Sequence, residues 1–300
     1  MNIAIVGAGF SGCLLYNKLI KKNHQITIFE KSRGTGGRLS TKYINDNFCD
    51  HGTPYFEAKN QNFIDFCNRL VKQKILKKYK KFYIPTKGIN KVCSSLINKE
   101  DLKTNIKITT CKYENKKWNL IDTQNNIYEN FDILLITIPA VQILELNINL
   151  NEQIKQDLSS IKYDSVFTLI LYGNKNLSLH KGLKNINLFK KIIDNSKKYN
   201  YDNFSSFVLH ANESFSTKNN EKTKEKLEEK VIKKLRKLHI EIDKDFIILP
   251  HLWKYAFAKN HLKKDFIFDK KQSLGICGDY FSNKNIEASF LSSTKLADNI

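Results

Sequence analysis

The stretch Asn2-Ile3-Ala4-Ile5-Val6-Gly7-Ala8-Gly9-Phe10-Ser11-Gly12 decides the fold of this 300-residue chain. Its first half is a short apolar run that predicts a buried strand, and residues 11–22 repeat apolar side chains at helical spacing. A second strand is expected over residues 25–30. Strand, glycine-rich turn, helix and strand in this order predict the first βαβ unit of a dinucleotide-binding fold.

The glycines of the turn have separate expected roles. Gly7 permits a tight turn, Gly9 lets a pyrophosphate approach the backbone, and Gly12 lets the helix pack close to the strand. Phe10 and Ser11 begin the helix, where free N–H groups would hold the phosphates. The alternative is a glycine-rich turn without a ligand, but the strand before it and the helix after it favour the ligand.

A carboxylate and a second glycine-rich loop follow the second strand. Glu30 lies 18 residues after Gly12 (30 − 12), where a carboxylate binds an adenosine ribose and disfavours a 2′-phosphate. The segment Glu30-Lys31-Ser32-Arg33-Gly34-Thr35-Gly36-Gly37-Arg38 comes next. A simple NAD domain does not need this loop, whereas FAD must extend past the first loop to place its isoalloxazine ring in a second domain. The further cofactor-binding candidates are Lys31, Arg33, Gly37 and Arg38. The alternative is an ordinary surface turn.

Apolar periodicity outlines the rest of the chain. Helices are expected over residues 60–76, 89–98, 219–239 and 285–298. Strands are expected over residues 105–111, 117–122, 132–139, 165–172, 205–210 and 272–277. Strand–helix alternation at both ends, with a mixed middle, predicts that the two ends build one parallel sheet and the middle a second domain.

The predicted fold class is therefore α/β: a two-domain, Rossmann-type FAD-binding flavoprotein with a discontinuous FAD domain and a mixed-sheet substrate domain. The expected FAD domain comprises residues 1–57, 86–142 and 268–300. The expected substrate domain comprises residues 58–85 and 143–267.

The net charge of +20 comes almost entirely from lysine. The arginines are Arg33, Arg38, Arg69 and Arg236. Nucleic-acid modules normally use arginine for bidentate contacts, so we expect no specific nucleic-acid partner. Lysine runs such as residues 77–81 are interpreted as a solvated face, with electrostatic steering of an anionic substrate as the alternative.

Composition also bears on location and metal binding. No apolar run approaches the ~20 residues that span a bilayer, so no membrane partner is expected. The N-terminal segment does not resemble a signal peptide, which favours a cytoplasmic location. The six cysteines form no Cys-x-x-Cys pair and no zinc-like spacing, so we expect buried apolar side chains and no metal.

Several segments, in order along the chain, resemble motifs of bacterial renalase-like proteins in the flavin amine oxidase superfamily. Residues 33–38 resemble the Arg-Gly-x-Gly-Gly-Arg loop of flavin amine oxidases. Residues 50–56 resemble Asp-His-Gly-Ala-Gln-Tyr-Phe, residues 206–211 resemble Trp-Val-x-His-Ala, and residues 251–256 resemble His-x-Trp-x-Tyr-Ala. Residues 278–281 and 286–289 resemble Gly-Asp-Trp and Val-Glu-Gly-Ala. The resemblance covers the whole chain.

The resemblance implies a flavoprotein of the hydroxybenzoate-hydroxylase or amine-oxidase kind, with FAD as cofactor. Asp279 would bond the ribityl or pyrophosphate region, and the last helix would begin beneath the flavin pyrimidine edge. The N-terminus of that helix would stabilise negative charge on reduced flavin. The additional cofactor-binding residues implied are Gly52, Gly278, Asp279, Ile286, Glu287 and Ala288.

The resemblance also implies an activity. Bacterial renalase-like enzymes oxidise 2- or 6-dihydro-NAD(P) and pass the electrons to O2, giving H2O2. Hydride leaving a dihydropyridine creates an aromatic pyridinium, so no protein base is required, and the sequence offers no nucleophile or acid–base dyad. The expected catalytic-site residues are His51, His210, Trp253 and Tyr255. For each of them, core packing or a satisfied buried side chain is the alternative.

Two other functions share the FAD motifs. One is an amine oxidase that oxidises a neutral amine in an aromatic cage. The other is a non-catalytic protein in which FAD is structural. The sequence also leaves open the NAD or NADP form of the substrate, the physiological electron acceptor and the oligomeric state.

Overall fold

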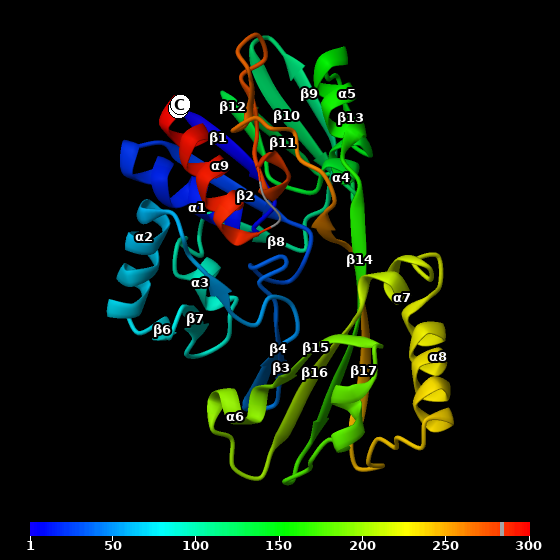
Figure 1. Ribbon diagram of the computed structural model, residues 1–300. Coiled ribbons are helices and arrows are strands. Elements are labelled where there is room, and N and C mark those ends of the chain that lie inside the picture. The colour runs from blue at the N-terminus through cyan, green and yellow to red at the C-terminus, as the bar shows by residue number, and fades with distance from the viewer. Residues whose placement is uncertain (283–284) are drawn as a thin grey trace. The chain divides into compact units, whose positions relative to one another are not determined.

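The computed structural model describes residues 1–282 and 285–300, which form two compact units (Figure 1). Unit 1 comprises Met1–Ser40, Tyr55–Lys162 and Ala258–Ile300. Unit 2 comprises Thr41–Pro54 and Tyr163–Phe257. Each unit is therefore assembled from segments that lie far apart in the sequence.

A six-stranded sheet with the order β18-β19-β12-β1-β2-β8 forms the centre of unit 1. Its strands are β1 (Asn2–Val6), β2 (Gln25–Glu30), β8 (Leu102–Thr104), β12 (Ile133–Ile136), β18 (Ile267–Asp269) and β19 (Leu274–Ile276). All neighbours are parallel except β18 and β19, which are antiparallel. Ile3, Ala4 and Ile5 of β1 are fully buried, as expected for a central strand covered on both faces.

The two ends of the chain meet in the core of unit 1. Helix α1 (Phe10–Leu19), which continues as a short 3-10 turn (Ile20–Lys22), lies beside α9 (Ile286–Asn299) in Figure 1. Leu15 of α1 and Leu296 of α9 belong to one apolar cluster. Phe63 of α2 (Gln61–Lys72) joins the same cluster.

Smaller elements complete unit 1. Its remaining helices are α3 (Lys91–Ser94), α4 (Ala140–Leu144), α5 (Glu152–Ser160) and the 3-10 turn η3 (Asp279–Phe281). One small sheet, in the order β5-β7-β6, consists of β5 (Phe56–Glu57), β6 (Leu76–Tyr79) and β7 (Phe82–Pro85). Another, in the order β11-β10-β9-β13, consists of β9 (Ile108–Glu114), β10 (Lys117–Asp122), β11 (Ile127–Phe131) and β13 (Asn147–Ile148).

Unit 2 is built on a four-stranded sheet with the order β15-β16-β14-β17. Its strands are β14 (Tyr163–Gly173), β15 (Phe189–Asp194), β16 (Ser205–Ala211) and β17 (Ile247–Ala258), and a hairpin is formed by β3 (Thr41–Ile44) and β4 (Asn47–Asp50). Its helices are η2 (Lys181–Asn185), α6 (Asn195–Tyr199), α7 (Glu213–Thr217) and α8 (Lys224–Lys237). The pairs β14–β16 and β15–β16 are antiparallel.

The two faces of this sheet have separate cores because side chains alternate along a strand. Leu169 of β14 and Leu209 of β16 pack with Val231 of α8. Their neighbours in sequence point to the other face: Ile170, after Leu169, and Val208, before Leu209, pack with the β3–β4 hairpin. Pro250 lies within β17, which is an edge strand, and an edge tolerates the missing N–H of proline.

The structure confirms the α/β fold and the βαβ unit at residues 2–30. Several expected elements are shorter or divided. The helix expected at 89–98 is a single turn, α3 (Lys91–Ser94), and the helix expected at 219–239 starts only at Lys224, where Thr223 caps it. The strand expected at 105–111 is instead β9 (Ile108–Glu114), with β8 before it, and β17 was not expected.

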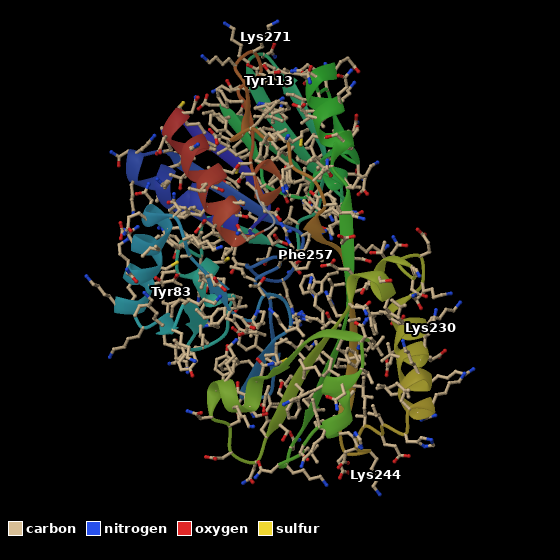
Figure 2. The ribbon with its side chains drawn as sticks, in the orientation of Figure 1. Tyr83, Tyr113, Lys230, Lys244, Phe257 and Lys271 are labelled. Carbon is tan, nitrogen blue, oxygen red and sulfur yellow. The ribbon has the colours of Figure 1, made fainter. Side chains whose placement is uncertain are left out.

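The compact units divide the chain at other positions than those expected. Residues 58–85 lie in unit 1, because Phe66 of α2 and Tyr83 of β7 belong to the same apolar cluster as α1. Figure 2 labels Tyr83 in this part of the chain. Residues 41–54 lie in unit 2, because Cys49 of the β3–β4 hairpin packs against the sheet there. The segments 143–162 and 258–267 also belong to unit 1.

All six cysteines are buried and free. Among residues 1–282 and 285–300, no helix is long and apolar enough to cross a membrane.

Candidate functional site

The glycines of the first loop differ in the space around them. A Cβ at Gly12 would lie 2.0 Å from the carbonyl oxygen of Gly7, and Gly7 has a φ of +104° that disfavours other residues. A Cβ at Gly9, by contrast, would meet no atom within 4 Å. Gly7 and Gly12 are therefore required by the backbone itself, whereas Gly9 leaves open space over the loop.

The open space lies at the N-terminus of α1. Gly9 is the N-cap residue of this helix, so no side chain caps it, and its first turn has no acidic residue. The second glycine-rich loop lies against the first, because the Gly36 N–H donates to the Ala8 carbonyl oxygen at 2.9 Å and Gly9 bridges to Gly36. Backbone N–H groups and the positive end of a helix dipole therefore lie at the open space over Gly9, which is an arrangement that binds phosphate.

Glu30 ties the two loops together. Its carboxylate accepts hydrogen bonds from the backbone N–H of Ala8 and from that of Ser32, each at 2.8 Å, and the residue is only 7% exposed. Each carboxylate oxygen has a second lone pair, so Glu30 retains acceptor capacity for ribose hydroxyl groups.

Arg38 and Asp279 are joined in a bidentate ion pair. Arg38 Nη1 donates to Asp279 Oδ2 at 2.7 Å, and Nη2 donates to Oδ1 at 2.6 Å. Each side chain was expected to contact FAD separately, and this pair was not predicted. Lys31 and Arg33 of the same loop are exposed, and Gly37 has a φ of +55° close to Gly9.

Some hydrogen-bonding groups at the start of α9 already have partners within the protein. The Asn285 side chain accepts the Ala288 N–H at 2.9 Å, so that donor is already used. The Glu287 carboxylate accepts the backbone N–H groups of Lys59 and Asn60, which links α9 to the start of α2. The backbone N–H groups of Ile286 and Glu287 stay the expected donors toward a flavin.

The residues of unit 1 therefore fit a dinucleotide cofactor. Gly9 leaves room for a pyrophosphate, α1 presents its N-terminus there, and the buried Glu30 can accept from a ribose. Gly278 precedes Asp279 in this unit, whereas Gly52 lies in unit 2 directly after His51.

Unit 2 contains a cluster of three histidines and one tryptophan, called the His–Trp cluster below. The His51 ring stacks on Trp253 with ring centroids 5.4 Å apart, and His251 meets both rings edge-on at 5.2 and 4.3 Å. His210 Nε2 donates to the His51 carbonyl oxygen at 2.9 Å. The indole N–H of Trp253 is buried and has no hydrogen-bond partner among the described residues.

Three of the four expected catalytic-site residues thus lie together, and Tyr255 contacts another partner. The Tyr255 ring packs against Tyr163 at 5.5 Å. His251 was not among the expected site residues, although it stands two residues before Trp253 on β17 and two-residue spacing places both on one strand face. That spacing is the signal that identifies it.

The histidines of the cluster are neutral near pH 7. Burial and the neighbouring histidines lower the pKa of His51 to about 3. Burial, with Lys191 nearby, lowers the pKa of His210 to about 4. Burial, followed by the charges of Lys224 and Lys42, lowers the pKa of His251 to about 4. The charged side chains that shift these pKa values, apart from the histidines, are all lysines.

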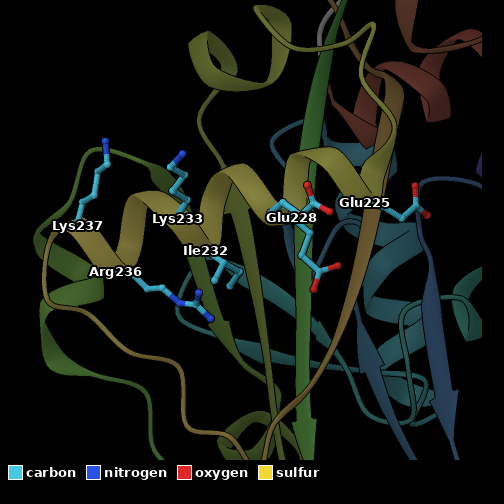
Figure 3. Close-up of a pocket in the computed structure, with 7 residues that line it drawn as sticks. Glu225, Glu228, Ile232, Lys233, Arg236 and Lys237 are labelled. Atoms are coloured by element: carbon cyan, nitrogen blue, oxygen red, sulfur yellow. The ribbon is translucent and has the colours of Figure 1, made fainter.

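Other regions offer less to a ligand. A hollow on α8 is lined by Glu225, Glu228, Glu229, Ile232, Lys233, Arg236 and Lys237 (Figure 3). All of these residues come from one helix and carry both signs of charge, which is typical of a solvated face. Within residues 1–282 and 285–300, no group of three or more His, Cys, Asp or Glu side chains is placed to hold a metal.

Comparison with known proteins extends these observations. Residues 5–70 match the model of an NAD(P)-binding Rossmann-like domain. Mouse (Mus musculus) renalase is 28% identical over 200 residues, an alignment that spans 57% of this chain and 57% of that relative. A 4,4'-diapophytoene desaturase of Staphylococcus haemolyticus is 48% identical over 48 residues, 16% of this chain and 9% of its own.

Solved structures match over nearly the whole chain. A CLA-producing fatty acid isomerase from P. acnes has a TM-score of 0.70 at 12% identity, covering 99% of this chain and 98% of its own. Putrescine oxidase bound to putrescine has a TM-score of 0.66 at 10% identity, covering 100% and 99%. These structures support the fold, and the Rossmann-like match and the renalase alignment show that the chain is similar to renalase over about 57% of the length of each protein.

Proposed function

We propose that the protein is a flavin oxidase for isomeric dihydronicotinamide dinucleotides, 2- or 6-dihydro-NAD(P). The observation that carries this proposal is the His–Trp cluster of unit 2, whose rings are uncharged near neutral pH and whose pKa-shifting charged neighbours are lysines. A neutral aromatic cluster within reach of cations suits a flat, uncharged ring attached to a phosphate-bearing chain.

The overall reaction converts the dihydronicotinamide, O2 and one proton into the oxidised dinucleotide and H2O2. When bound, FAD supplies the hydride acceptor and the route of the two electrons to O2. The departing hydride leaves an aromatic pyridinium, so the protein needs no group that removes a proton from the substrate. The neutral histidines are consistent with that requirement.

The cluster residues would bind and orient the substrate. Trp253 offers a stacking surface for the nicotinamide ring. His210 donates from Nε2 to the His51 carbonyl oxygen, so its Nδ1 carries a lone pair that would accept from the carboxamide N–H. The His51 ring, stacked on Trp253, keeps the indole in one orientation. Orientation of this kind is worth several orders of magnitude in rate.

The amine-oxidase alternative fits this cluster less well. An amine substrate is a cation near neutral pH, and the lysines that act on the cluster would disfavour its approach. The histidines, with pKa values of about 3 to 4, are too weakly basic to deprotonate an ammonium group.

The test is H2O2 release under steady-state turnover. The FAD-loaded protein is mixed with 2-dihydro-NAD, 6-dihydro-NAD and their phosphorylated forms, with ordinary 4-dihydro-NADH, and with a panel of primary amines. We expect H2O2 with a 2- or 6-dihydro isomer only. Turnover of an amine alone would establish the amine-oxidase alternative, and no turnover with any compound would favour a structural role for FAD.

A further inference from the structure

Helix α6 (Asn195–Tyr199) contacts the segment that carries His51. This segment, Asp50–Pro54, leaves the end of β4 within unit 2. The buried Asn195 side chain accepts the Asp50 N–H at 3.1 Å. The Tyr199 hydroxyl donates to the Asp50 carboxylate. A helix of five residues therefore holds both the backbone and the side chain of Asp50.

Lys198 joins the two ends of the same segment. Its ammonium group donates to the Asp50 carboxylate and to the Pro54 carbonyl oxygen, the latter at 2.6 Å. The two side chains of the ion pair are 9% and 0% exposed. Thr41 also donates to Asp50, at 2.7 Å.

A buried ion pair of this kind has a cost. Removing both charges from water is unfavourable, and the pair is tolerated because further hydrogen bonds satisfy the charged groups. Apolar side chains of similar volume would often stabilise the fold as well or better. Stability alone therefore does not explain the buried Lys198–Asp50 pair. Its place beside the segment that carries His51 indicates a role in positioning that histidine.

His51 lies inside the segment and is fixed from both directions. On one side, Asp50 and Pro54 are bound by Lys198. On the other, the His51 carbonyl oxygen accepts from His210, and the His51 ring stacks on Trp253. A shift of the segment would therefore move the His51 ring against the indole.

We propose that Lys198 is a positioning residue that acts through Asp50 and the Pro54 carbonyl to hold His51 against Trp253 in the substrate site. The proposal rests on the proposed function for the meaning of that site. The neighbouring Lys197 provides a matched control, since its side chain is 88% exposed and its ammonium group lies 3.9 Å from Asp194 at the start of the same helix.

A first experiment reads the position of His51 without reference to activity. Histidine-selective isotope labelling gives ring resonances for the seven histidines, and the His51 signals are assigned by their loss in His51→Gln. We expect Lys198→Met to shift or broaden the His51 signals and Lys197→Met to leave them unchanged. Unchanged His51 signals in a folded Lys198→Met protein would overturn the proposal.

A second experiment reads the consequence for substrate. The FAD-loaded variants are mixed anaerobically with 6-dihydro-NAD, and flavin reduction is followed by absorbance. Misplacement should raise the substrate dissociation constant or lower the limiting rate of Lys198→Met by about 10-fold or more, with FAD content unchanged. Lys197→Met should match the parent protein. Equal kinetics for both variants and the parent would overturn the proposal.

The double variant Asp50→Asn/Lys198→Met covers the case in which Lys198→Met alone does not fold. It removes both buried charges, so we expect recovery of the fold but not of the His51 signals. Recovery of the parent His51 signals would overturn the proposal, because charge balance alone would then explain the pair. If the parent protein is not reduced by any dihydronicotinamide, the proposed function fails, and the resonance experiment still decides whether Lys198 positions His51.

Discussion

Arg38 donates two parallel hydrogen bonds to Asp279, at 2.7 and 2.6 Å, although 241 residues separate them in the sequence. Asp279 is 5% exposed, so its charge is compensated chiefly by this guanidinium. The pair joins the second glycine-rich loop to the turn after β19 within unit 1. Two groups expected to contact a cofactor are thus already oriented by one another.

Arg38→Lys should lower both the stability of the apoprotein and its affinity for FAD. A lysine donates from one nitrogen and does not reproduce the bidentate contact with Asp279. Loss of a charge-assisted hydrogen bond costs about 1.5–3 kcal/mol, which corresponds to roughly 10- to 100-fold in FAD affinity if the pair orients the cofactor site. Flavin-reconstitution titration and thermal melting measure the two effects. Arg69→Lys, at an exposed arginine of α2, is the control. Unchanged FAD affinity in Arg38→Lys would show that the pair is structural only.

Glu30→Ala should loosen the two loops and reduce FAD retention together. The substitution leaves the N–H groups of Ala8 and Ser32 without their carboxylate acceptor. A lost hydrogen bond to a charged group costs about 1.5–3 kcal/mol, so FAD affinity should fall about 10- to 100-fold. Urea denaturation of the apoprotein and flavin titration are the measurements, with the exposed Glu114→Ala as control. Full FAD affinity in Glu30→Ala would mean that the carboxylate serves the loops and not the ribose.

Alanine substitutions at Gly12 and Gly9 of the same loop should affect different properties, the stability of the fold and the affinity for FAD. Gly12→Ala places a Cβ 2.0 Å from the Gly7 carbonyl oxygen, so the unfolding free energy should fall by about 1–3 kcal/mol or more. Gly9→Ala meets no atom within 4 Å, so stability should change by less than about 0.5 kcal/mol while FAD binding weakens. Denaturation and flavin titration separate the two. An FAD affinity of Gly9→Ala equal to that of the parent would place the pyrophosphate elsewhere.

Acid should destabilise the protein partly through its buried histidines. The folded-state pKa is about 3 for His51 and about 4 for His210 and His251, below the ordinary value of 6.5. The unfolded chain therefore binds protons that the folded chain excludes, so this stabilisation is complete above about pH 7. It is lost as the pH falls from about 6.5 to about 4 for His210 and His251, and to about 3 for His51. Each histidine contributes up to about 1.4 kcal/mol per pH unit in that window.

Urea denaturation at a series of pH values measures this slope. His251→Asn should make the decline shallower, whereas His239→Asn, at an exposed position after α8, should leave it as in the parent. Equal slopes for all three proteins would contradict the burial of a neutral His251.

Trp253→Ala should keep its FAD but reduce it more slowly when mixed anaerobically with 6-dihydro-NAD. Loss of the stacking surface should cost about 1–3 kcal/mol of transition-state stabilisation, and Trp253→Phe should recover part of it. The rate of flavin reduction should be nearly independent of pH between about 6 and 9, because the cluster histidines titrate well below that range. A steep pH dependence centred near neutrality would instead indicate a substrate amine that must lose a proton.

The local elements near the N-terminus were predictable because each depends on its own residues. The apolar run at 2–6, the glycine spacing and Glu30 predict β1, α1 and β2 with their relative order, and the structure has them so. His51, His210 and Trp253 were expected from the resemblance to renalase-like motifs, and their role in substrate binding stays a prediction.

Contacts across long stretches of sequence were not predictable in the same way. Nothing near Arg38 indicates Asp279, and nothing near Asp50 indicates Lys198, which is one of many lysines. Proline is uncommon inside strands, yet β17 passes through Pro250, because an edge strand tolerates a residue without an N–H. Short strands such as β6 are set by packing, which local propensity does not contain.

Because unit 1 comprises three segments separated by unit 2 in the sequence, its sheet is completed late during synthesis. Its central sheet places β19, near residue 276, beside β12, so the last parallel strand emerges from the ribosome after every residue of unit 2. At about 5–20 residues per second, the β12 edge stays open for several seconds after its own synthesis. During that interval unit 2 can already complete its fold, while the nascent dinucleotide-binding sheet exposes an unpaired parallel edge. The protein thus has a window in translation when chaperone capture or mispairing competes with docking of its C-terminal strand.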